Sequence, residues 1–310
     1  AGIDHAARLI GRVSGDSTVA YAIAFAQAIE AASGIAAPRR AQGLRALMLE
    51  LERIANHLGD IGAICNDASF AIMLAHCGIL RERVLRAAAI AFGHRLMMDR
   101  VIPGGVAVDL SSEGVAAIRA VLADIAARLP ALVALYDGTT SLQDRTVGTG
   151  VLTPALARQF GAGGYVGRAS GRSFDARNLA SPLPYKEIGF APATRQEGDV
   201  NARVWVRIDE VTHSLALIGR LLDGLPAGAV SAALPDVAEP REGMALVEGF
   251  RGDVLAWVSL SADGRVARCH PRDPSWFQWP LLEAVIEGNI VADFPLCNKS
   301  FNCSYSGHDL

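Results

Sequence analysis

The stretch "LRALMLELERIANHLGDIGA", Leu44 to Ala63, decides the fold class of this chain. Its apolar side chains recur at the three-and-four spacing that forms one stripe along one face of an α-helix. They are Leu44, Leu47, Met48, Leu51, Ile54, Ala55 and Leu58. Pro38 precedes this pattern, at a position where a helix tolerates the missing N–H of proline. We therefore predict a long helix with one buried face.

The same stretch carries a second, charged pattern, formed by Arg45, Glu50, Arg53, His57 and Asp60. At helical spacing such residues are most simply interpreted as ion pairs that face solvent or link neighbouring helices. His57, taken alone, is interpreted as a histidine satisfied within the helix rather than as a metal ligand.

Helical patterns continue on both sides of this stretch. Residues 17–100 read as helix almost throughout, 112–136 as a helix pair interrupted at Pro130, and a further helix ends at Gly224–Pro226. Residues 161–198 lack periodicity and predict a long irregular loop. Residues 243–270 alternate in polarity between turn signals and predict a small antiparallel β meander. The fold class is therefore α+β with predominantly long helices, in a single domain over residues 1–310.

The composition narrows the range of functions. The 310 residues have a mean hydropathy of +0.27 and a net charge of −3, so no basic field is present to attract a nucleic acid. No apolar run reaches the roughly 18 residues of a membrane span, and no signal peptide is evident. The five cysteines are widely spread, which indicates reduced thiols and a cytoplasmic location.

Two polar segments near the ends of the chain stand apart from these patterns. "RVSGDSTVAY", Arg12 to Tyr21, places Ser14, Asp16 and Ser17 where any of them could cap the following helix. "CNKSFNCSYSGHDL" ends the chain, and a weaker alternative is that Cys297, Cys303 and His308 bind a single metal ion. A buried, inert cysteine is the simpler interpretation of Cys303, because soft metals need several thiolates or imidazoles together.

Taken together, several long motifs resemble one family. It comprises the large subunit of membrane-bound group 4 nickel–iron hydrogenases of the formate hydrogenlyase type and the related quinone-site large subunit of respiratory complex I. The matching motifs are Leu44–Ala63, "GHRLMMDRVIPGGVAVD" (93–109), "GRASGRSFDARN" (167–178), "GDVNARVWVRIDEVTHSLALI" (198–218), "VEGFRGDV" (247–254) and "DPSWFQWPLLEAVIEGNIVADF" (273–294). The resemblance implies a hydrogenase-like helical bundle, without the family's N-terminal β-rich segment.

The resemblance also gives the two polar segments a meaning. In the hydrogenases the first resembles R-x-C-G-I-C-x-x-x-H, whose two cysteines, with two more from a C-x-x-C near the C-terminus, hold nickel and iron. Here Ser14 and Ser17 stand at the first two positions, Tyr21 at the histidine, and Cys303 is followed by Ser306 at the last pair. One of four thiolates is left, and serine hydroxyls bind soft metals poorly. The resemblance implies a vacated metal pocket lined by Ser14, Asp16, Ser17, Tyr21, Cys303 and Ser306, with no metal bound.

Comparison with the complex I subunit implies a partner and leaves quinone chemistry open. Arg12 matches an arginine that faces the iron–sulfur cluster of a small partner subunit, whereas Gly15 and Met97 replace a quinone-facing tyrosine and a cluster-facing histidine. Quinone binding is possible, but most of its ligands are missing.

The expected function is that of a large subunit in a membrane-associated oxidoreductase complex of the hydrogenase or NADH–quinone oxidoreductase type. Electrons would arrive through the partner's iron–sulfur cluster, because no cofactor is expected on this chain. We expect it on the inner face of the membrane, held there by membrane subunits, and able to dimerise when isolated. The alternative is a structural subunit that couples its neighbours without redox chemistry.

Overall fold

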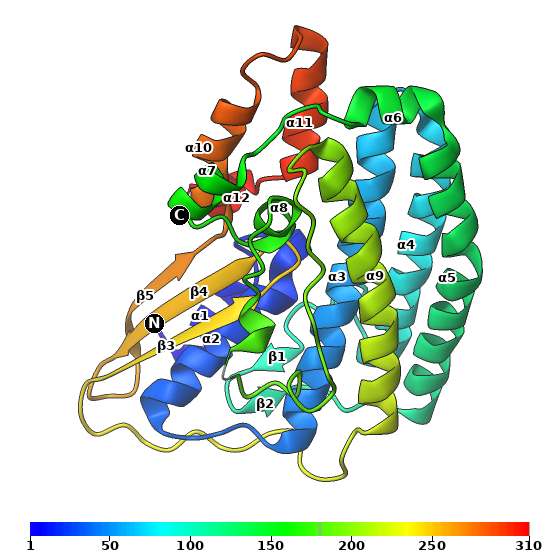
Figure 1. Cartoon of the computed structure of the whole chain (residues 1–310). Helices are drawn as coiled ribbons and strands as arrows, with labels where there is room; N and C mark the ends of the chain where they lie inside the picture. The colour runs from blue at the N-terminus through cyan, green and yellow to red at the C-terminus, as the bar shows by residue number, and fades with distance from the viewer. Residues whose placement is uncertain (180, 310) are drawn as a thin grey trace.

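The computed structural model describes residues 1–179 and 181–309 and has two parts that share one core. On one side, long helices stand next to one another (Figure 1). They are α3 (Arg39–Asp67), α4 (Ala71–Phe92), α5 (Ser112–Gly138) and α9 (Val200–Asp223). On the other side lies a three-stranded sheet packed against α2 (Thr18–Ser33). The predicted α+β class with dominant helices is confirmed.

Helix α3 is the centre of the bundle because it packs on α4 and α9, while α4 also packs on α5. The predicted apolar stripe is fully buried, and so are the charged residues between its members. Arg45, Glu50, Arg53 and His57 are 0% exposed. The solvent-facing interpretation of these charges is therefore wrong, and the interhelical one holds.

Helix α5 corrects the predicted break at Pro130, because the helix runs through that residue. Proline removes one N–H and leaves the carbonyl of Ala126, four residues earlier, without its helical partner. Both Ala126 and Pro130 are exposed, so water can bond that carbonyl. A proline on the wet face of a helix costs less than one in the core.

The predicted meander is confirmed as strands β3 (Arg241–Glu248), β4 (Asp253–Leu260) and β5 (Val266–Arg272), paired antiparallel in that order. Arg241 pairs with Leu260 and Glu248 with Asp253, so a tight turn joins β3 to β4. Helix α2 crosses β3 so closely that a side chain at Gly243 would overlap the backbone of α2 at Ala28. The turn between β3 and β4 is thereby held beside the N-terminal end of α2.

Several short elements were not predicted, because each is too short to show a period. They are α1 (Ile3–Ile10), the hairpin β1 (Val101–Ile102) and β2 (Gly105–Val106), α6 (Thr140–Thr146) and α7 (Pro154–Gln159). The predicted irregular loop 161–198 contains α8 (Gly164–Ala169) and the 3-10 turn η2 (Ala176–Asn178).

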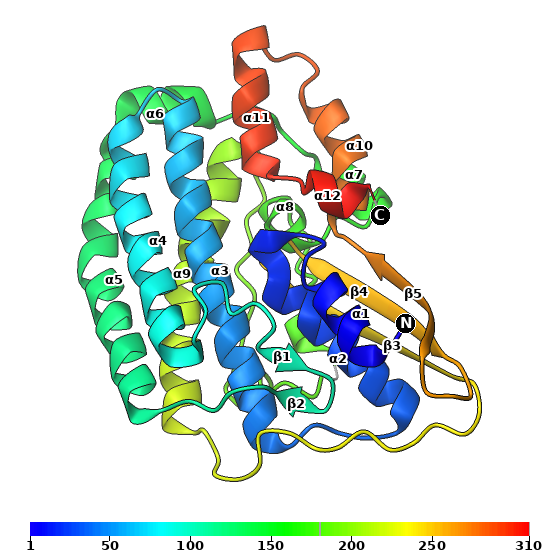
Figure 2. The same ribbon diagram turned by 180° about the vertical axis from the view of Figure 1, so that it is seen from behind.

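The C-terminal region folds back over the start of α2. It consists of α10 (Ser275–Val285), η3 (Val291–Asp293), α11 (Phe294–Phe301) and α12 (Tyr305–His308). Figure 2 shows α12 close to the turn between α1 and α2. Over the described residues, no helix is both long enough and apolar enough to cross a membrane.

Candidate functional site

The two polar segments identified in the sequence meet in the fold. The 3-10 turn η1 (Gly15–Ser17) leads into α2 and lies against the C-terminal segment that carries α12 (Figure 2). The Ser14 hydroxyl lies 3.1 Å from the Ser304 hydroxyl, 290 residues further along the chain. The turn between β3 and β4 supplies the third wall through Arg251. These three segments form the candidate site.

An ion pair between Asp16 and Arg251 lies at the centre of the site. Arg251 donates from Nη1 to Asp16 Oδ1 at 2.7 Å and from Nη2 to Asp16 Oδ2 at 2.5 Å. It also donates to the Ser17 hydroxyl at 3.1 Å and to the Asn302 carbonyl at 2.6 Å. Burial opposes ionisation of Asp16, but the guanidinium holds the pKa of this carboxyl below its usual value. The pair therefore stays charged and ties η1 to the sheet.

A row of hydroxyls leads from the surface to this ion pair. The exposed Ser306 lies 3.4 Å from Ser304, Ser304 lies 3.1 Å from Ser14, and Ser14 donates to Asp16 Oδ1 at 2.8 Å. Each hydroxyl can donate and accept at once, so such a row can pass a proton. Three of the predicted pocket residues, Ser14, Asp16 and Ser306, thus belong to one hydrogen-bonded row.

Cys303 lies in the same segment but makes no strong polar contact. Its Sγ lies 4.0 Å from Gln278 Oε1 in a buried position. Burial raises the pKa of the Cys303 thiol to about 12, so the thiol is protonated at neutral pH. One thiol is also too few for a soft metal, which needs several thiolates or imidazoles together.

Tyr21, for which the resemblance implies a histidine in the hydrogenases, forms a hydrogen bond with a residue that the sequence did not single out. Its hydroxyl donates to Asp273 Oδ2 at 2.5 Å, and each of the two residues is only 1% exposed. Burial and the neighbouring carboxylate both raise the pKa of Tyr21, which keeps the phenol neutral. Tyr21 therefore links α2 to the start of α10 and does not point to an open ligand position.

Arg12 does not belong to this group. It lies in the connection between α1 and η1, where it donates to both carboxylate oxygens of Asp99 at 2.8 Å. Both side chains are well exposed, at 45% for Arg12 and 37% for Asp99. Arg12 therefore faces outward, next to a surface groove lined by Arg8, Asp99 and Arg100.

The predicted caps of α2 are wrong. Ser17 stands at the N-cap position but its side chain makes no capping bond, because it is engaged with Asp16 and Arg251. The capping acceptor is Glu52 of α3, which accepts from the N–H of Val19 at 2.7 Å and from the N–H of Ala20 at 3.1 Å. The carboxyl group of a residue in another helix thus satisfies the first turn of α2.

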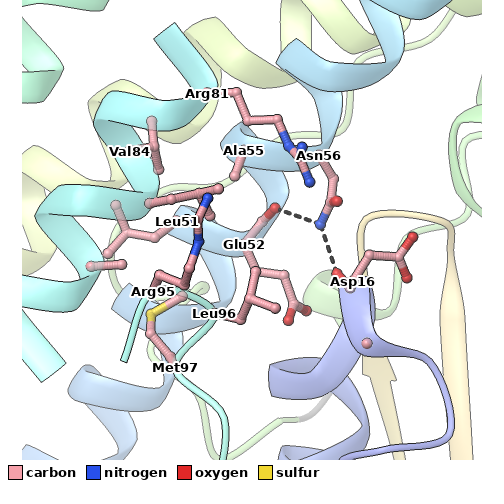
Figure 3. Close-up of a pocket in the computed structure, with 13 residues that line it drawn as sticks. Asp16, Leu51, Glu52, Ala55, Asn56, Arg81, Val84, Arg95, Leu96 and Met97 are labelled. Carbon is pink, nitrogen blue, oxygen red and sulfur yellow. Dashed lines mark hydrogen bonds between the residues drawn. The ribbon is translucent and has the colours of Figure 1, made fainter. Parts of the chain in front are cut away.

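Glu52 and Asp16 also line a cavity between η1, α3 and α4 (Figure 3). Its walls are mostly apolar, and Arg81 and Arg95 stand on its far side from η1. Asn56 holds the two sides together by donating to the backbone carbonyls of Asp16 at 2.7 Å and Glu52 at 2.9 Å. Burial raises the pKa of Glu52 to about 8, against the opposing effect of the two N–H groups that it accepts.

The alternative of a separate metal site at Cys297, Cys303 and His308 finds no support. Within residues 1–179 and 181–309, no three side chains of His, Cys, Asp or Glu come together in a way that could hold a metal ion. Cys297 lies against Gly150 and Arg203, whereas the ring of His308 packs on Trp279. The three residues thus have separate surroundings.

Sequence reasoning missed several residues that build the site. They are Glu52, Arg251, Asp273, Gln278 and Ser304. Arg251 was visible only as part of a turn signal, and Asp273 only as the start of a matching motif. No local pattern distinguishes them, because their partners lie far away in the chain.

Comparisons with known proteins show which family this chain is similar to. Residues 67–245 match the family described as "Respiratory-chain NADH dehydrogenase, 49 Kd subunit". An NADH-quinone oxidoreductase subunit of Syntrophobacter fumaroxidans is 32% identical over 86% of this chain and 72% of its own length. Formate hydrogenlyase subunit 5 of Escherichia coli is 32% identical over 97% of this chain, which spans about half (53%) of that relative.

A solved structure agrees over the whole chain. It belongs to the membrane-bound sulfane sulfur reductase, described as an archaeal respiratory membrane complex. One chain of that complex superposes with a TM-score of 0.93 at 26% identity, over 100% of this chain and 86% of the other. The relatives are subunits of multi-subunit membrane complexes, and the expected resemblance is confirmed.

Proposed function

This chain belongs to the family of the respiratory-chain NADH dehydrogenase 49 Kd subunit. We propose that it is a large subunit that works without a nickel–iron centre. It would take part in electron transfer within a membrane-associated oxidoreductase complex, through an iron–sulfur cluster held by a small partner subunit. Membrane subunits of the complex would hold it peripherally on the inner, cytoplasmic face of the membrane. Quinone is a possible reactant, and the isolated chain would be able to dimerise.

The donor chemistry at the candidate site carries this proposal. Of the four cysteine thiolates that the resemblance implies for a nickel–iron centre, this chain offers one, Cys303. Ser14 and Ser17 already bond Asp16, and Ser306 contacts Ser304. The residues therefore do not fit such a centre, and no chemical step is assigned to it.

The residues of the site can hold a buried ion pair and pass protons along a row of hydroxyls. The Asp16–Arg251 pair fixes the turn between α1 and α2, while the row from Ser306 to Ser14 connects it to solvent. Protons needed for a reduction near this turn have a route along the hydroxyls. Electrons have no carrier among these side chains, which is why the proposal needs a partner's cluster.

Arg12 supports the position of that partner. Its guanidinium is exposed and held in place by Asp99, and the groove beside it adds the cationic side chains of Arg8 and Arg100. A fixed positive group next to a cluster stabilises the reduced, more negative state of the cluster. We propose that this face meets the small iron–sulfur subunit.

The first test is the nickel and iron content of the complex purified with its partners, with an infrared scan for iron-bound carbon monoxide and cyanide. The proposal expects no nickel, no such bands, and iron accounted for by the partner's clusters. Nickel at one per large subunit, with those bands, would overturn it.

A second test separates electron transfer from a purely structural role. Arg12→Ala should shift the reduction potential of the partner's cluster or slow turnover. Arg39→Ala is the matched control, since Arg39 is also an exposed arginine paired with a carboxylate, Glu187, but begins α3. An assembled Arg12→Ala complex with unchanged potential and turnover would leave only the structural role.

A further inference from the structure

The bundle core contains a second polar feature, a cluster of charged side chains that are between 0% and 4% exposed. Its ion pairs join α3, α8, α9, the region of η2 and the end of β3, of which α3, α8, α9 and β3 are labelled in Figure 1. We call it the buried charge cluster. Its members are Glu50, Arg53, His57, Arg168, Asp175, Arg177, Glu210 and Glu248.

The charges in the cluster do not balance if all its acids are ionised. Four carboxylates oppose three guanidiniums, which leaves an excess of one negative charge. An uncompensated charge in a protein interior costs several kcal/mol, so a buried group takes up a proton instead. Either His57 or one of the carboxyls must hold that proton.

His57 is a poor carrier for it. Its Nε2 donates to Glu210 Oε2 at 2.6 Å, whereas its Nδ1 is buried and has no hydrogen-bond partner among the described residues. A second proton on Nδ1 would therefore have no acceptor. Burial lowers the pKa of His57, although Glu210 opposes that effect. The neutral ring with its proton on Nε2 satisfies the geometry.

Two of the four carboxylates are strongly compensated. Glu50 accepts from Arg177 at 3.1 Å, from the Tyr185 hydroxyl at 2.6 Å and from the Ser214 hydroxyl at 2.5 Å. Glu210 accepts from His57 and from Arg168 Nε at 2.8 Å. Burial opposes ionisation of both acids, but Arg53 and these donors hold the pKa of Glu50 below the usual range, and Arg168 and His57 do the same for Glu210.

Asp175 is compensated in the same way, by a fork of two bonds. Arg177 donates to it from Nε at 2.9 Å and from Nη2 at 2.7 Å, and Arg168 Nη1 lies 3.0 Å away. Burial opposes ionisation, but the two guanidiniums hold the pKa of Asp175 below its usual value. Asp175 is therefore also ionised.

Glu248 is the least compensated member. It accepts one bond from Arg168 Nη1 at 2.7 Å and one from the N–H of Ala176 at 2.9 Å. Arg168 Nη1 is shared with Asp175, so that single guanidinium nitrogen serves two carboxylates. Asp253, on the neighbouring strand, adds a further negative charge, although Arg272 pairs with it at 2.7 Å.

We propose that the buried charge cluster is a proton-binding site of this subunit and that Glu248 carries the proton. Binding forms one O–H bond on the Glu248 carboxyl with a proton from water, and no electron moves. The bound proton leaves the cluster with equal numbers of positive and negative charges. Burial, Asp175 and Asp253 raise the pKa of Glu248 to about 7, against the opposing effect of Arg168 and Arg177, so the site fills and empties near neutral pH. The site is distinct from the hydroxyl row and does not depend on the proposed function.

The test is an infrared pH titration of the complex in H₂O and D₂O. We expect a carboxylic-acid C=O band that shifts in D₂O and disappears with a midpoint near pH 7. The band should be absent from Glu248→Gln, which has the shape of the protonated acid. Glu242→Gln, an exposed position on the same strand, should keep it.

Asp175→Asn provides a second, independent check if Glu248→Gln does not fold. This variant removes the acid that competes for Arg168 Nη1, so the midpoint of the band should move to lower pH. A wild-type protein without such a band between about pH 5 and pH 8 would overturn the proposal. So would a band with its midpoint near pH 7 that persists in the double variant Glu52→Gln with Glu248→Gln, in which the buried acid of Glu52, with its pKa of about 8, no longer contributes a band.

Discussion

Replacing Tyr21 by phenylalanine tests whether the candidate site is held together by its own polar contacts. The Tyr21 hydroxyl donates to Asp273 Oδ2 at 2.5 Å, and both residues are 1% exposed. Asp273 Oδ1 accepts from the N–H of Ser275 at 2.8 Å, so the substitution leaves Oδ2 without this donor. Hydrogen bonds to charged groups contribute about 1.5–3 kcal/mol, and a buried acceptor left unpaired puts the loss at the upper end. We expect Tyr21→Phe to lower the free energy of unfolding by about 2–3 kcal/mol.

The assay is urea unfolding followed by circular dichroism, with Tyr136→Phe as the matched control. Tyr136 is 0% exposed and its hydroxyl donates to the neutral Asn201 Oδ1 at 2.7 Å, so its removal should cost about 1 kcal/mol. The double variant Tyr21→Phe with Asp273→Asn should lose less than the sum of the two single losses, because both remove the same bond. A loss below about 0.5 kcal/mol for Tyr21→Phe, or additive losses, would show that this bond does not stabilise the fold.

Three further outcomes are expected. Gly105→Ala should destabilise the fold by about 1–3 kcal/mol in thermal unfolding, because its Cβ would overlap the backbone carbonyl of Val230; an unchanged melting temperature would contradict this close approach. Cys303 has a pKa of about 12, so only roughly one molecule in ten thousand carries the thiolate at pH 8, and a thiol reagent should label this residue rapidly only after unfolding. Labelling is read by mass spectrometry, and fast labelling of the native protein would contradict the burial of Cys303. Glu248 has its pKa raised from 4.5 to about 7 on folding, so its contribution to stability is full below pH 4.5 and is lost as pH rises through 7. The unfolding free energy of the wild type, measured relative to that of Glu248→Gln at each pH, should therefore fall by roughly 3 kcal/mol over that range, and parallel curves for the two proteins would contradict the assignment.

Much of the fold follows from spacing along the chain. The stripe from Leu44 to Leu58 indicated α3, and the alternation after residue 243 indicated the meander, because both patterns repeat within a few residues. Pro130 shows the limit of such reasoning. A proline lowers helix propensity wherever it occurs, but its cost depends on whether the freed carbonyl meets water or the core, and only the fold decides that.

The candidate site was predicted in part. The resemblance brought Ser14, Ser17, Tyr21, Cys303 and Ser306 together, and the structure places them around one turn near the C-terminal helices. Their actual partners were not predicted. A serine ahead of a helix has the local signature of a cap, yet the capping group of α2 is Glu52, a residue of another helix.

By itself, the sequence determined the helical periods, the meander and the family, and it has Ser14, Ser17 and Ser306 at three of the four positions where the resemblance implies metal-binding cysteines. The tertiary structure alone decided which charges are buried and what compensates each of them. Arg53 and Glu50 look like surface residues of a helix, but they become core residues because α9 packs on α3 and the end of β3 accepts a hydrogen bond from Arg53. The physical reason is the distance along the chain between the residues that interact. Backbone periodicity is set by neighbours three or four residues away, whereas the pKa of Glu248 is set by Arg168, 80 residues distant, and by the exclusion of water from the space between them.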